Sequence, residues 1–283
     1  MSGRLPPWIR TRIPSGKRFA HVSTILDGGD LRTVCREAKC PNRAECWGAG
    51  TATFMVLGDV CTRACRFCGV RHASPSLGPA APDPGEPDRI ARAVRRLDLK
   101  HVVVTSVTRD DLEDGGAGHI ARVIDALSGD TGVRIEALIP DILPPHLSKI
   151  AQRPLFILAH NIEVVRRLTP LVRDGRADYD KSLRVLREAK RIRSDLLTKS
   201  SLMLGLGESG EEVDEAMEDL RGCGVDLLTL GQYLQPGRSN IPVSEYLAPE
   251  AWEELGAKGE AMGFRAVLAG PMVRSSYLAG ELV

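Results

Sequence analysis

A short apolar run and three closely spaced cysteines lie together in the stretch TFMVLGDVCTRACRFC, residues 53–68. The run Thr53–Leu57 is short and apolar, as a strand buried in a parallel sheet is. Cys61, Cys65 and Cys68 follow it directly, and Phe67 stands just before the last of them. We therefore predict a buried strand that ends in a cysteine-bearing loop.

The rest of the chain alternates between strand-like and helix-like segments. Further strand-like runs lie at Val102–Thr105, Arg134–Ile139, Leu155–Leu158, Ser201–Leu206, Leu227–Leu230 and Ala266–Leu268. Helix-like runs lie between most of them, at Asp88–Leu97, Gly118–Leu127, His146–Ala151, Glu163–Leu168, Lys181–Ile192, Glu211–Arg221 and Pro249–Met262. This alternation predicts parallel β/α units, in an open doubly wound sheet or in a whole or partial barrel. Six or seven units over about 215 residues are slightly short for an eight-unit barrel.

The composition argues against several classes of protein. The 283 residues carry 38 Lys and Arg against 37 Asp and Glu, and this balance argues against a dominant basic field for nucleic acid. Aromatic residues make up only 4%, which argues against stacking platforms for single strands. No apolar run is long enough to span a bilayer. We therefore expect a globular protein that binds neither nucleic acid nor membrane.

The start of the chain is rich in Arg and has no acid before Asp27, which is typical of a transit peptide. However, Pro6, Pro7 and Pro14 interrupt any amphipathic helix there, and this favours a basic arm of the mature protein. No stretch resembles a secretory signal. We therefore expect a cytoplasmic protein, in which free thiols rather than disulfides are the default.

Six of the seven cysteines fall within 34 positions and form two triplets. The triplets are Cys35-x4-Cys40-x5-Cys46 and Cys61-x3-Cys65-x2-Cys68. Disulfides are rare in cytosolic chains of this size, and structural zinc normally takes four ligands with two-residue spacings. Closely spaced thiolates favour iron–sulfur clusters, because soft sulfur ligands suit iron. Three cysteines on a cluster of four irons leave one iron open, and an open iron can bind a substrate.

The second triplet resembles the signature of the radical S-adenosylmethionine (SAM) superfamily, in which an aromatic residue precedes the third cysteine. The resemblance implies an α/β fold, a partial (β/α)6-type TIM barrel. It implies that Cys61, Cys65 and Cys68 hold three irons of a catalytic [4Fe–4S] cluster and that the fourth iron chelates SAM. An electron from the cluster would cleave SAM to a 5′-deoxyadenosyl radical, which abstracts hydrogen from an unactivated carbon.

The first triplet, shortly before the second, makes the chain resemble the lipoyl synthase family. This resemblance extends over nearly the whole chain. Its motifs are Pro7-Trp8-Ile9-Arg10, Cys40-Pro41-Asn42, Glu45-Cys46-Trp47, Thr105-Ser106-Val107, Asp110-Asp111, Asp114-Gly115-Gly116, His160-Asn161-Ile162-Glu163, Thr198-Lys199-Ser200, Gly205-Leu206-Gly207-Glu208, Gly231-Gln232-Tyr233-Leu234-Gln235-Pro236, Gly270-Pro271 and Arg274-Ser275-Ser276-Tyr277. Any one of these glycine motifs is weak evidence, whereas the ordered set is strong.

The family resemblance implies a second, auxiliary [4Fe–4S] cluster on the first triplet, Cys35, Cys40 and Cys46. Its fourth ligand would be Ser276, with Ser275 as the alternative. A serine oxygen is a harder donor than a thiolate, so this bond would be labile. The residues alone also allow the two serines merely to cap a turn. Leu278 stands where family members commonly have histidine.

The family's reaction inserts two sulfur atoms, at C6 and C8, into an octanoyl chain attached to a lysine of a lipoyl-carrier protein. The auxiliary cluster would supply both sulfurs, and each insertion would consume one SAM. The cofactors implied are therefore two [4Fe–4S] clusters and SAM. The partners implied are an octanoylated carrier domain, an electron donor such as flavodoxin or ferredoxin, and an iron–sulfur cluster delivery protein. The alternatives are a radical SAM enzyme of the biotin synthase or methylthiotransferase type and a zinc-stabilised module that is not an enzyme.

Three parts of the chain follow from this resemblance. Residues 1–50 would form an N-terminal extension that carries the auxiliary cysteines. Residues 51–265 would form the partial barrel. Residues 266–283 would form a C-terminal extension with the serine motif. We expect the two extensions to close the mouth of the barrel.

Nine residues are candidate SAM contacts, and they are Thr105, Ser106, Asp114, Gly115, Gly116, Asn161, Glu163, Lys199 and Glu208. The first two end a predicted strand, where barrel enzymes place their chemistry. The glycine pair would present backbone groups to SAM's amino group, or simply turn the chain into a helix. Asn161 and Glu163 would bind ribose hydroxyls, although Glu163 also fits a solvated acid in the first turn of a helix. Lys199 is equally consistent with a surface charge.

Charge is unevenly distributed along the chain. Residues 166–199 contain eleven Lys and Arg against five acids, and Arg184, Arg187 and Arg191 recur at helical spacing. They would form either a solvated helix face or a dock for an acidic carrier domain, since complementary fields steer encounter.

Overall fold

The computed structural model describes residues 5–11, 13–74, 76–129, 132–277 and 279–280, so Leu278 lies outside the described residues. Its main sheet has seven parallel strands in chain order: β2 (Thr53–Val56), β5 (His101–Ser106), β6 (Arg134–Leu138), β7 (Ile157–Ala159), β8 (Leu197–Leu204), β9 (Leu227–Gln232) and β10 (Ala266–Gly270). A short strand, β1 (Arg32–Thr33), pairs antiparallel with the outer edge of β2. No hydrogen bonds between described residues join β10 to β1, so the predicted partial barrel is confirmed.

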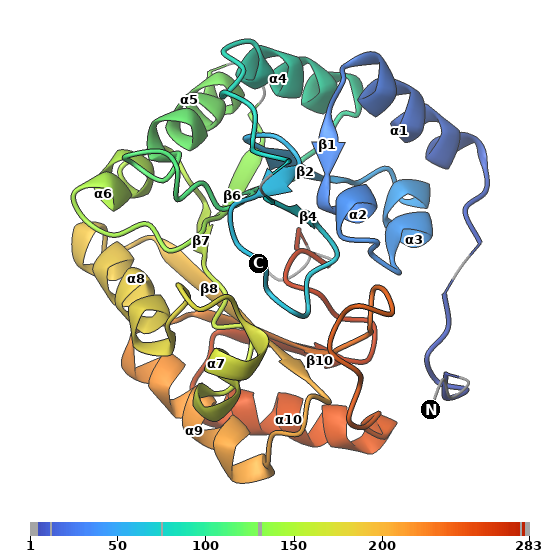
Figure 1. The fold of residues 1–283 in the computed structure, drawn as a ribbon, viewed down its shortest axis with the longest axis vertical. Coiled ribbons are helices and arrows are strands. Elements are labelled where there is room, and N and C mark those ends of the chain that lie inside the picture. The colour runs from blue at the N-terminus through green and yellow to red at the C-terminus, as the bar shows by residue number, and fades with distance from the viewer. Residues whose placement is uncertain (1–4, 12, 75, 130–131, 278, 281–283) are drawn as a thin grey trace.

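Helices cover the outside of this curved sheet, as Figure 1 shows. The main ones are α4 (Glu86–Arg96), α5 (Ala117–Ser128), α6 (His146–Ala151), α8 (Tyr179–Ile192), α9 (Gly210–Gly222) and α10 (Pro249–Ala261). They agree closely with the predicted helices, because each buries one apolar face against the strands. At the start of α9, Ser209 and Glu212 form a capping box.

Two predicted segments differ from the structure. The segment Glu163–Leu168 begins with an isolated bridge from Glu163 to β8 and only then forms a 3₁₀ turn, η1 (Arg166–Leu168), and the short helix α7 (Thr169–Val172). The predicted strand Ser201–Leu206 starts earlier, at Leu197, because its polar residues are buried inside the barrel rather than exposed. It ends before Gly205, which has φ +95 and where a Cβ would lie 2.2 Å from the Gln232 side chain.

The cysteine loop after β2 is supported by a separate small ladder of β3 (Val60–Cys61) and β4 (Arg71–His72). The auxiliary cysteines lie on and between two short helices, α2 (Val34–Glu37) and α3 (Arg43–Gly48), which follow α1 (Lys17–Gly28). These three helices lie beside the β1 edge of the barrel (Figure 1).

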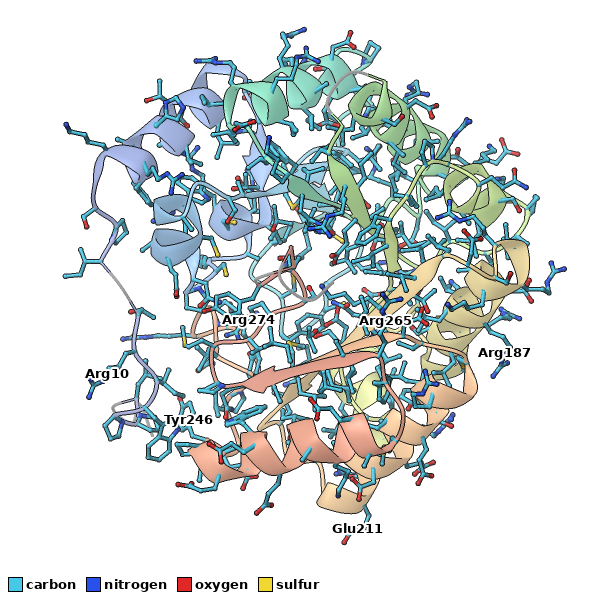
Figure 2. All side chains as sticks on the ribbon, turned by 180° about the vertical axis from the view of Figure 1, so that it is seen from behind. Arg10, Arg187, Glu211, Tyr246, Arg265 and Arg274 are labelled. Carbon is cyan, nitrogen blue, oxygen red and sulfur yellow. The ribbon has the colours of Figure 1, made fainter. Side chains whose placement is uncertain are left out.

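The C-terminal segment after β10 returns to the middle of the ring of strands and helices (Figure 1). Figure 2 places Arg274 of this segment in the middle of the molecule and Arg187 of α8 at its outer edge. In the part of the chain that the structure describes, every helix is too short or too polar to cross a membrane.

Candidate active site

The three cysteines of the second triplet lie at the C-terminal end of β2 and line one cavity as free thiols; they are Cys61, Cys65 and Cys68. The Sγ of Cys61 accepts backbone hydrogen bonds from Arg63 (3.4 Å) and Thr108 (3.3 Å). The Sγ of Cys65 accepts one from Asp174 (3.3 Å). Such bonds stabilise negative charge on sulfur, as the thiolate ligands of iron–sulfur clusters require.

The loop 61–68 is anchored by side chains from other loops. Buried Arg63 donates from Nε and Nη2 to the two oxygens of Asp110, at 3.1 and 3.0 Å. Asn240 Nδ2 donates to the carbonyl of Cys68 at 2.9 Å. The first contact comes from the loop after β5 and the second from the loop after β9, so the cysteine loop is fixed from two directions.

A buried carboxylate that the sequence analysis did not predict lies beside this loop. Asp141 follows β6, and its side chain is 1% exposed. It pairs with Arg63 and, at 3.4 Å, with Nε2 of His160. Arg173 Nη2 and Lys181 Nζ each lie 3.7 Å away. Burial alone would raise the pKa of Asp141, but the hydrogen bonds and charges of His160 and Arg63 hold it well below its usual range. Its position directly after a strand is the signal that could have found it.

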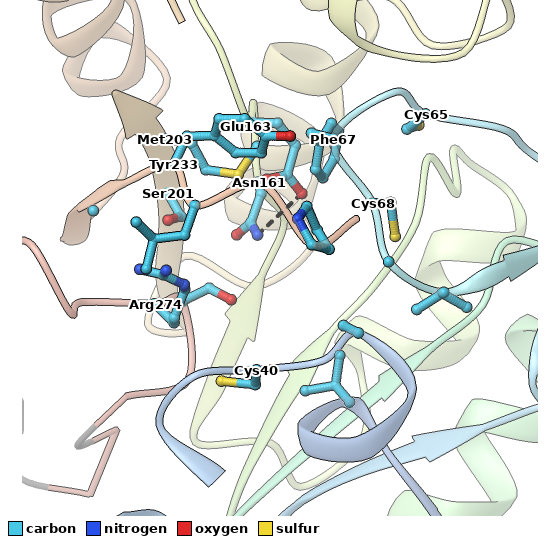
Figure 3. A pocket seen from close by; sticks show the side chains of 18 of the residues that line it. Cys40, Cys65, Phe67, Cys68, Asn161, Glu163, Ser201, Met203, Tyr233 and Arg274 are labelled. Atoms are coloured by element: carbon cyan, nitrogen blue, oxygen red, sulfur yellow. Dashed lines mark hydrogen bonds between the residues drawn. The ribbon is translucent and has the colours of Figure 1, made fainter. Parts of the chain in front are cut away.

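A cavity of about 860 Å³ opens at the C-terminal ends of the strands. Figure 3 shows Cys65 and Cys68 on one side of it and Cys40 on the other. Apolar side chains such as Phe67 and Met203 form part of its wall. Four of the nine candidate SAM contacts line it: Thr105, Ser106, Asn161 and Glu163.

Glu163 is held against β8 instead of beginning a helix. Its φ is +70, its N–H donates to the carbonyl of Ser201 (3.1 Å), and its own carbonyl accepts from the N–H of Met203 (2.8 Å). The half-buried side chain accepts a hydrogen bond from Asn161 Nδ2 at 3.2 Å, and burial raises its pKa. The interpretation as a solvated acid in a helix is therefore wrong.

The other five candidates do not line this cavity; they are Asp114, Gly115, Gly116, Lys199 and Glu208. Lys199 lies inside β8, fully buried, and its Nζ is 2.9 Å from Oε1 of Glu136, so it is not a surface charge. Glu208 accepts the N–H groups of Gly205 and Leu206 and closes the turn after β8. Nothing in this placement brings Lys199 or Glu208 to SAM, and those contacts remain predictions.

The segment 114–116 turns the chain into α5. Asp114 accepts the N–H groups of Gly116 (2.9 Å) and Gly118 (2.8 Å). Gly116 has φ +89, and a Cβ there would lie 2.3 Å from the Leu57 side chain. Only glycine fits this close approach. The turn accounts for these contacts, and a role of the backbone in binding SAM remains a prediction.

The auxiliary triplet is built on short elements. Cys35 lies on α2, Cys46 lies on α3, and Cys40 lies between them. Burial raises the pKa of the Cys35 thiol, and the nearby backbone of Thr53, at the start of β2, partly opposes this rise. The net effect raises the pKa of Cys35 to about 11, and burial raises that of Cys46 to about 12. The free thiols are therefore protonated at neutral pH, and metal binding must release their protons.

The C-terminal segment brings Ser275 and Ser276 back to these cysteines. The Oγ1 of Thr53 donates to the Oγ of Ser276 at 3.0 Å, across 223 positions of sequence. Asn42 Nδ2 donates to the carbonyl of Met272 at 2.6 Å. Both serines line the main cavity, but only Ser276 also lines a second cavity together with all three auxiliary cysteines.

Both donor sets fit an iron–sulfur cluster. Among the described residues, no three Cys, His, Asp or Glu side chains converge on a single metal-ion position. A cubane has a different requirement, because each iron takes its own thiolate and the thiolates surround the cluster. At the auxiliary site, the Arg274 guanidinium lies near Cys40, and its burial lowers its pKa. As a buried cation it would offset the negative charge of bound thiolates.

Two family profiles match this chain. The profile of the radical SAM superfamily matches residues 55–220, and that of the N-terminal domain of lipoyl synthase matches residues 2–40. Lipoyl synthases from Anaeromyxobacter dehalogenans and Thermus thermophilus are 50% and 51% identical to it, over 100% and 98% of this chain and 96% and 86% of their own lengths. A mitochondrial lipoyl synthase from Drosophila mojavensis is 48% identical, over 98% of this chain and 78% of its own length.

Solved structures share the fold at low sequence identity. SuiB from Streptococcus suis bound to S-adenosylmethionine has a TM-score of 0.58 and 10% identity, over 81% of this chain and 54% of its own. Methylornithine synthase PylB has a TM-score of 0.54 and 14% identity, over 81% of this chain and 67% of its own. At these identities the likeness shows the fold alone.

Proposed function

This chain belongs to the lipoyl synthase family of radical SAM enzymes, and we propose that it inserts two sulfur atoms, at C6 and C8, into an octanoyl chain carried on a lysine of a lipoyl-carrier protein. As a radical SAM enzyme it uses SAM and an iron–sulfur cluster. The observation that carries the proposal is one cavity lined by the catalytic triplet, by Cys40 of the auxiliary triplet and by Ser276. A sulfur-inserting enzyme needs both groups to face one substrate.

We assign the catalytic [4Fe–4S] cluster to Cys61, Cys65 and Cys68. The anchored loop and the N–H groups aimed at sulfur support this assignment. Asn161 and Glu163 lie in the same cavity as a polar pair suited to hydroxyl groups, and Thr105 and Ser106 line its floor. These four residues are our candidates for binding SAM.

We assign an auxiliary [4Fe–4S] cluster to Cys35, Cys40, Cys46 and Ser276. Support comes from the shared cavity and from the hydrogen bond that positions Ser276. When bound, SAM and the two clusters supply an electron, a 5′-deoxyadenosyl radical and sulfide. The chain's own contribution is to hold the octanoyl carbons between them and to exclude water, which would otherwise intercept a reactive intermediate.

The wall of the main cavity suits an octanoyl chain. Phe67, Met203, Tyr233 and Val273 contribute apolar surface to it. Beyond its amide carbonyl, an octanoyl chain is purely hydrocarbon, so apolar contact and exclusion of water can hold it. We propose that the chain crosses the cavity here, with its lysine end at the rim.

The rim offers a dock for the carrier domain. Lys39 and Arg238 line the cavity and are exposed, and neither forms an ion pair with a described residue. In contrast, Arg187 points outward from α8 on the outer wall (Figure 2). We therefore propose that an acidic carrier face meets Lys39 and Arg238 rather than the arginines of α8. An electron donor such as flavodoxin or ferredoxin and a cluster delivery protein complete the proposed partners.

Anaerobic turnover tests the proposed function. Purified protein with about eight irons and eight sulfides per chain would be incubated with SAM, a reductant and an octanoyl-lysine peptide. Mass spectrometry should show a gain of two sulfurs per peptide and two SAM molecules cleaved per product. Unchanged peptide from a chain loaded with both clusters would overturn the proposal. A colourless purified protein that holds zinc would overturn it before turnover is measured.

A further inference from the structure

The auxiliary cysteines also face a second cavity, of about 460 Å³, which we call the port cavity. Cys35, Cys40 and Cys46 line it together with Ser276, and the catalytic triplet does not. The rest of its wall comes from α1, α3, the segment 97–101 and the C-terminal segment. Of these elements, α1 and α3 lie outside the ring of strands, beside its β1 edge, whereas the C-terminal segment lies in the middle of the ring (Figure 1). The auxiliary site is therefore reached from two directions.

The two cavities are adjacent, because some residues line both of them. Cys40, Arg274 and Ser276 line both of them. On the proposed function, SAM and the octanoyl chain occupy the main cavity during turnover. A replacement cluster cannot pass through an occupied cavity, whereas the port cavity is bordered by exposed residues of α1 and by exposed Ala49.

Basic side chains outnumber acidic ones in the lining of the port cavity, with Arg18, Lys100 and Arg274 against Glu45 and Asp98. Arg18 and His21 are exposed and lie on one face of α1, three positions apart. No described carboxylate forms an ion pair with either. Lys100 also lies at the rim, but Asp98 Oδ1 is 2.9 Å from its Nζ and offsets its charge. The free cation of Arg18 and the imidazole of His21 therefore face whatever enters.

We propose that the port cavity is the entry site for a thiolate-ligated [4Fe–4S] cluster that replaces the auxiliary cluster after turnover, an inference that rests on the proposed function. Such a cluster carries net negative charge, which suits the Arg18 and His21 face. Each iron–sulfur bond to a donor thiolate that breaks is replaced by a bond to Cys35, Cys40 or Cys46. The proton of the chain thiol passes to the departing donor thiolate. The Ser276 hydroxyl replaces the fourth donor in the same way, and no electron is transferred.

The starting material for the test is the full chain after one turnover, in which the catalytic cluster remains and the auxiliary cluster has been consumed. The probe is a [4Fe–4S] cluster enriched in ⁵⁷Fe and ligated by 2-mercaptoethanol. Mössbauer spectroscopy then reports the rate of loading at the auxiliary site alone. If turnover releases no cluster iron, the proposed function fails before the port is tested.

The first variant pair tests the charge of the rim. Arg18→Glu should slow loading about fivefold at low ionic strength, because attraction becomes repulsion. The matched control is Arg184→Glu, the same change at an exposed position of α8 far from the port cavity, and it should load at the native rate. Equal rates for both variants and the native chain would count against the role of the rim.

The second variant pair tests the route itself. Ala49 is exposed and lines the port cavity, so Ala49→Trp should slow loading severalfold by obstruction. The control is Ala20→Trp, at an exposed position of α1 that does not line the cavity. Saturating SAM and octanoyl-lysine peptide should leave the native loading rate unchanged. Loading that is blocked by these ligands and unaffected by Ala49→Trp would overturn the port and assign entry to the main cavity.

Discussion

The two cysteine triplets are held in different ways. The loop 61–68 is tied down at short intervals: Arg63 contacts two carboxylates, and the Ala64 N–H donates to Asp174 Oδ2 at 2.9 Å. The auxiliary triplet lies on helices of four and six residues, and the hydrogen bonds that tie this region to the C-terminal segment, from Asn42 to Met272 and from Thr53 to Ser276, span 230 and 223 positions of sequence. Helices this short have little stability of their own, so these contacts decide whether the site holds together.

The difference corresponds to two kinds of work. A cluster that transfers electrons must keep its geometry through every cycle, and dense buried contacts provide that. A cluster that gives up sulfur must release ligands and accept a replacement, and short helices that depend on contacts distant in sequence open locally more readily than long ones. We therefore expect mutations at the first site to affect the protein as a whole, and mutations at the second to affect mainly the exchange of the cluster.

The largest expected effect comes from removing one thiol at each site. Cys65→Ala and Cys40→Ala should both abolish the sulfur-containing product and lower the iron content from about eight to about four per chain. Only Cys40→Ala should still cleave SAM to 5′-deoxyadenosine, because its catalytic triplet is intact. Iron analysis and chromatography of the nucleoside measure this. If Cys65→Ala also cleaves SAM, the assignment of the two triplets is wrong.

Asp141→Asn should destabilise the loop 61–68 of the catalytic cluster without removing a cysteine ligand. It removes the charge that neutralises Arg63, Arg173 and Lys181 in a buried setting, which typically costs about 3 kcal/mol. We expect a lower free energy of unfolding and loss of catalytic-cluster iron, with auxiliary-cluster iron retained. Asp195→Asn, at an exposed carboxylate that pairs with Arg193 away from both cavities, is the control and should change neither. Equal loss of iron from both sites would contradict the comparison.

The same carboxylate gives a pH dependence with a definite sign. Its pKa in the folded chain is held below its usual range, so its contribution to stability is complete at neutral pH. That contribution is lost as the pH falls below the ordinary carboxyl value of about 3.9 toward the lowered one. The difference in unfolding free energy between the native chain and Asp141→Asn should therefore shrink between neutral pH and about pH 3. Denaturant titrations at the two pH values measure it, and a constant difference would contradict the assignment.

Much of the fold follows from local sequence, and Lys199 shows where local sequence no longer suffices. Apolar runs such as Thr53–Leu57 predict strands well, since a strand buried on both faces needs no other property. The start of β8 was missed because Lys199 reads as exposed, although Glu136, 63 positions earlier, neutralises it inside the barrel. An ion pair between residues so far apart in sequence depends on which strands become neighbours in the sheet. The residues around Lys199 alone do not show which strand will be its neighbour.

The candidate site also has features that local sequence predicts and features that it does not. The cysteine spacings predict both cluster sites, because ligands on one loop must be close in sequence. The hydrogen bond from Thr53 to Ser276 joins residues 223 positions apart, and only the family resemblance pointed to the serine. The position of Asp141 after a strand marks it as a site candidate but does not reveal its partners, and the port cavity has no counterpart in the sequence because it arises where several elements converge.

Charge reversal at the mouth of the main cavity should weaken docking of the carrier domain without changing either cluster site. Lys39 lies next to the auxiliary Cys40, and Arg238 lies two positions from Asn240, which anchors the catalytic loop. Lys39→Glu with Arg238→Glu should raise KM about tenfold for a carrier-bound substrate and leave KM for an octanoyl-lysine peptide unchanged. Arg184→Glu with Arg191→Glu, on the outer wall, should change neither value. An equal rise for carrier and peptide would mean that the rim acts on the cavity and not on docking.

The smallest effect concerns Thr53, which joins the barrel to the auxiliary site. Its backbone lies near the Cys35 thiol, and its hydroxyl donates to Ser276 Oγ at 3.0 Å. Thr53→Val keeps the shape and the backbone but removes the hydroxyl donor, and the loss of one such hydrogen bond is worth about 1 kcal/mol, or roughly fivefold in rate. We therefore expect a chelator to remove auxiliary iron roughly fivefold faster from Thr53→Val, and at the native rate from Thr53→Ser, which retains the hydroxyl.

The catalytic cluster should lose iron equally slowly in all three chains, because no contact described at loop 61–68 depends on Thr53. Faster loss from both clusters would show that Thr53 supports the barrel as a whole, and the contrast between a rigid and an exchangeable site would then fail at its most direct connection.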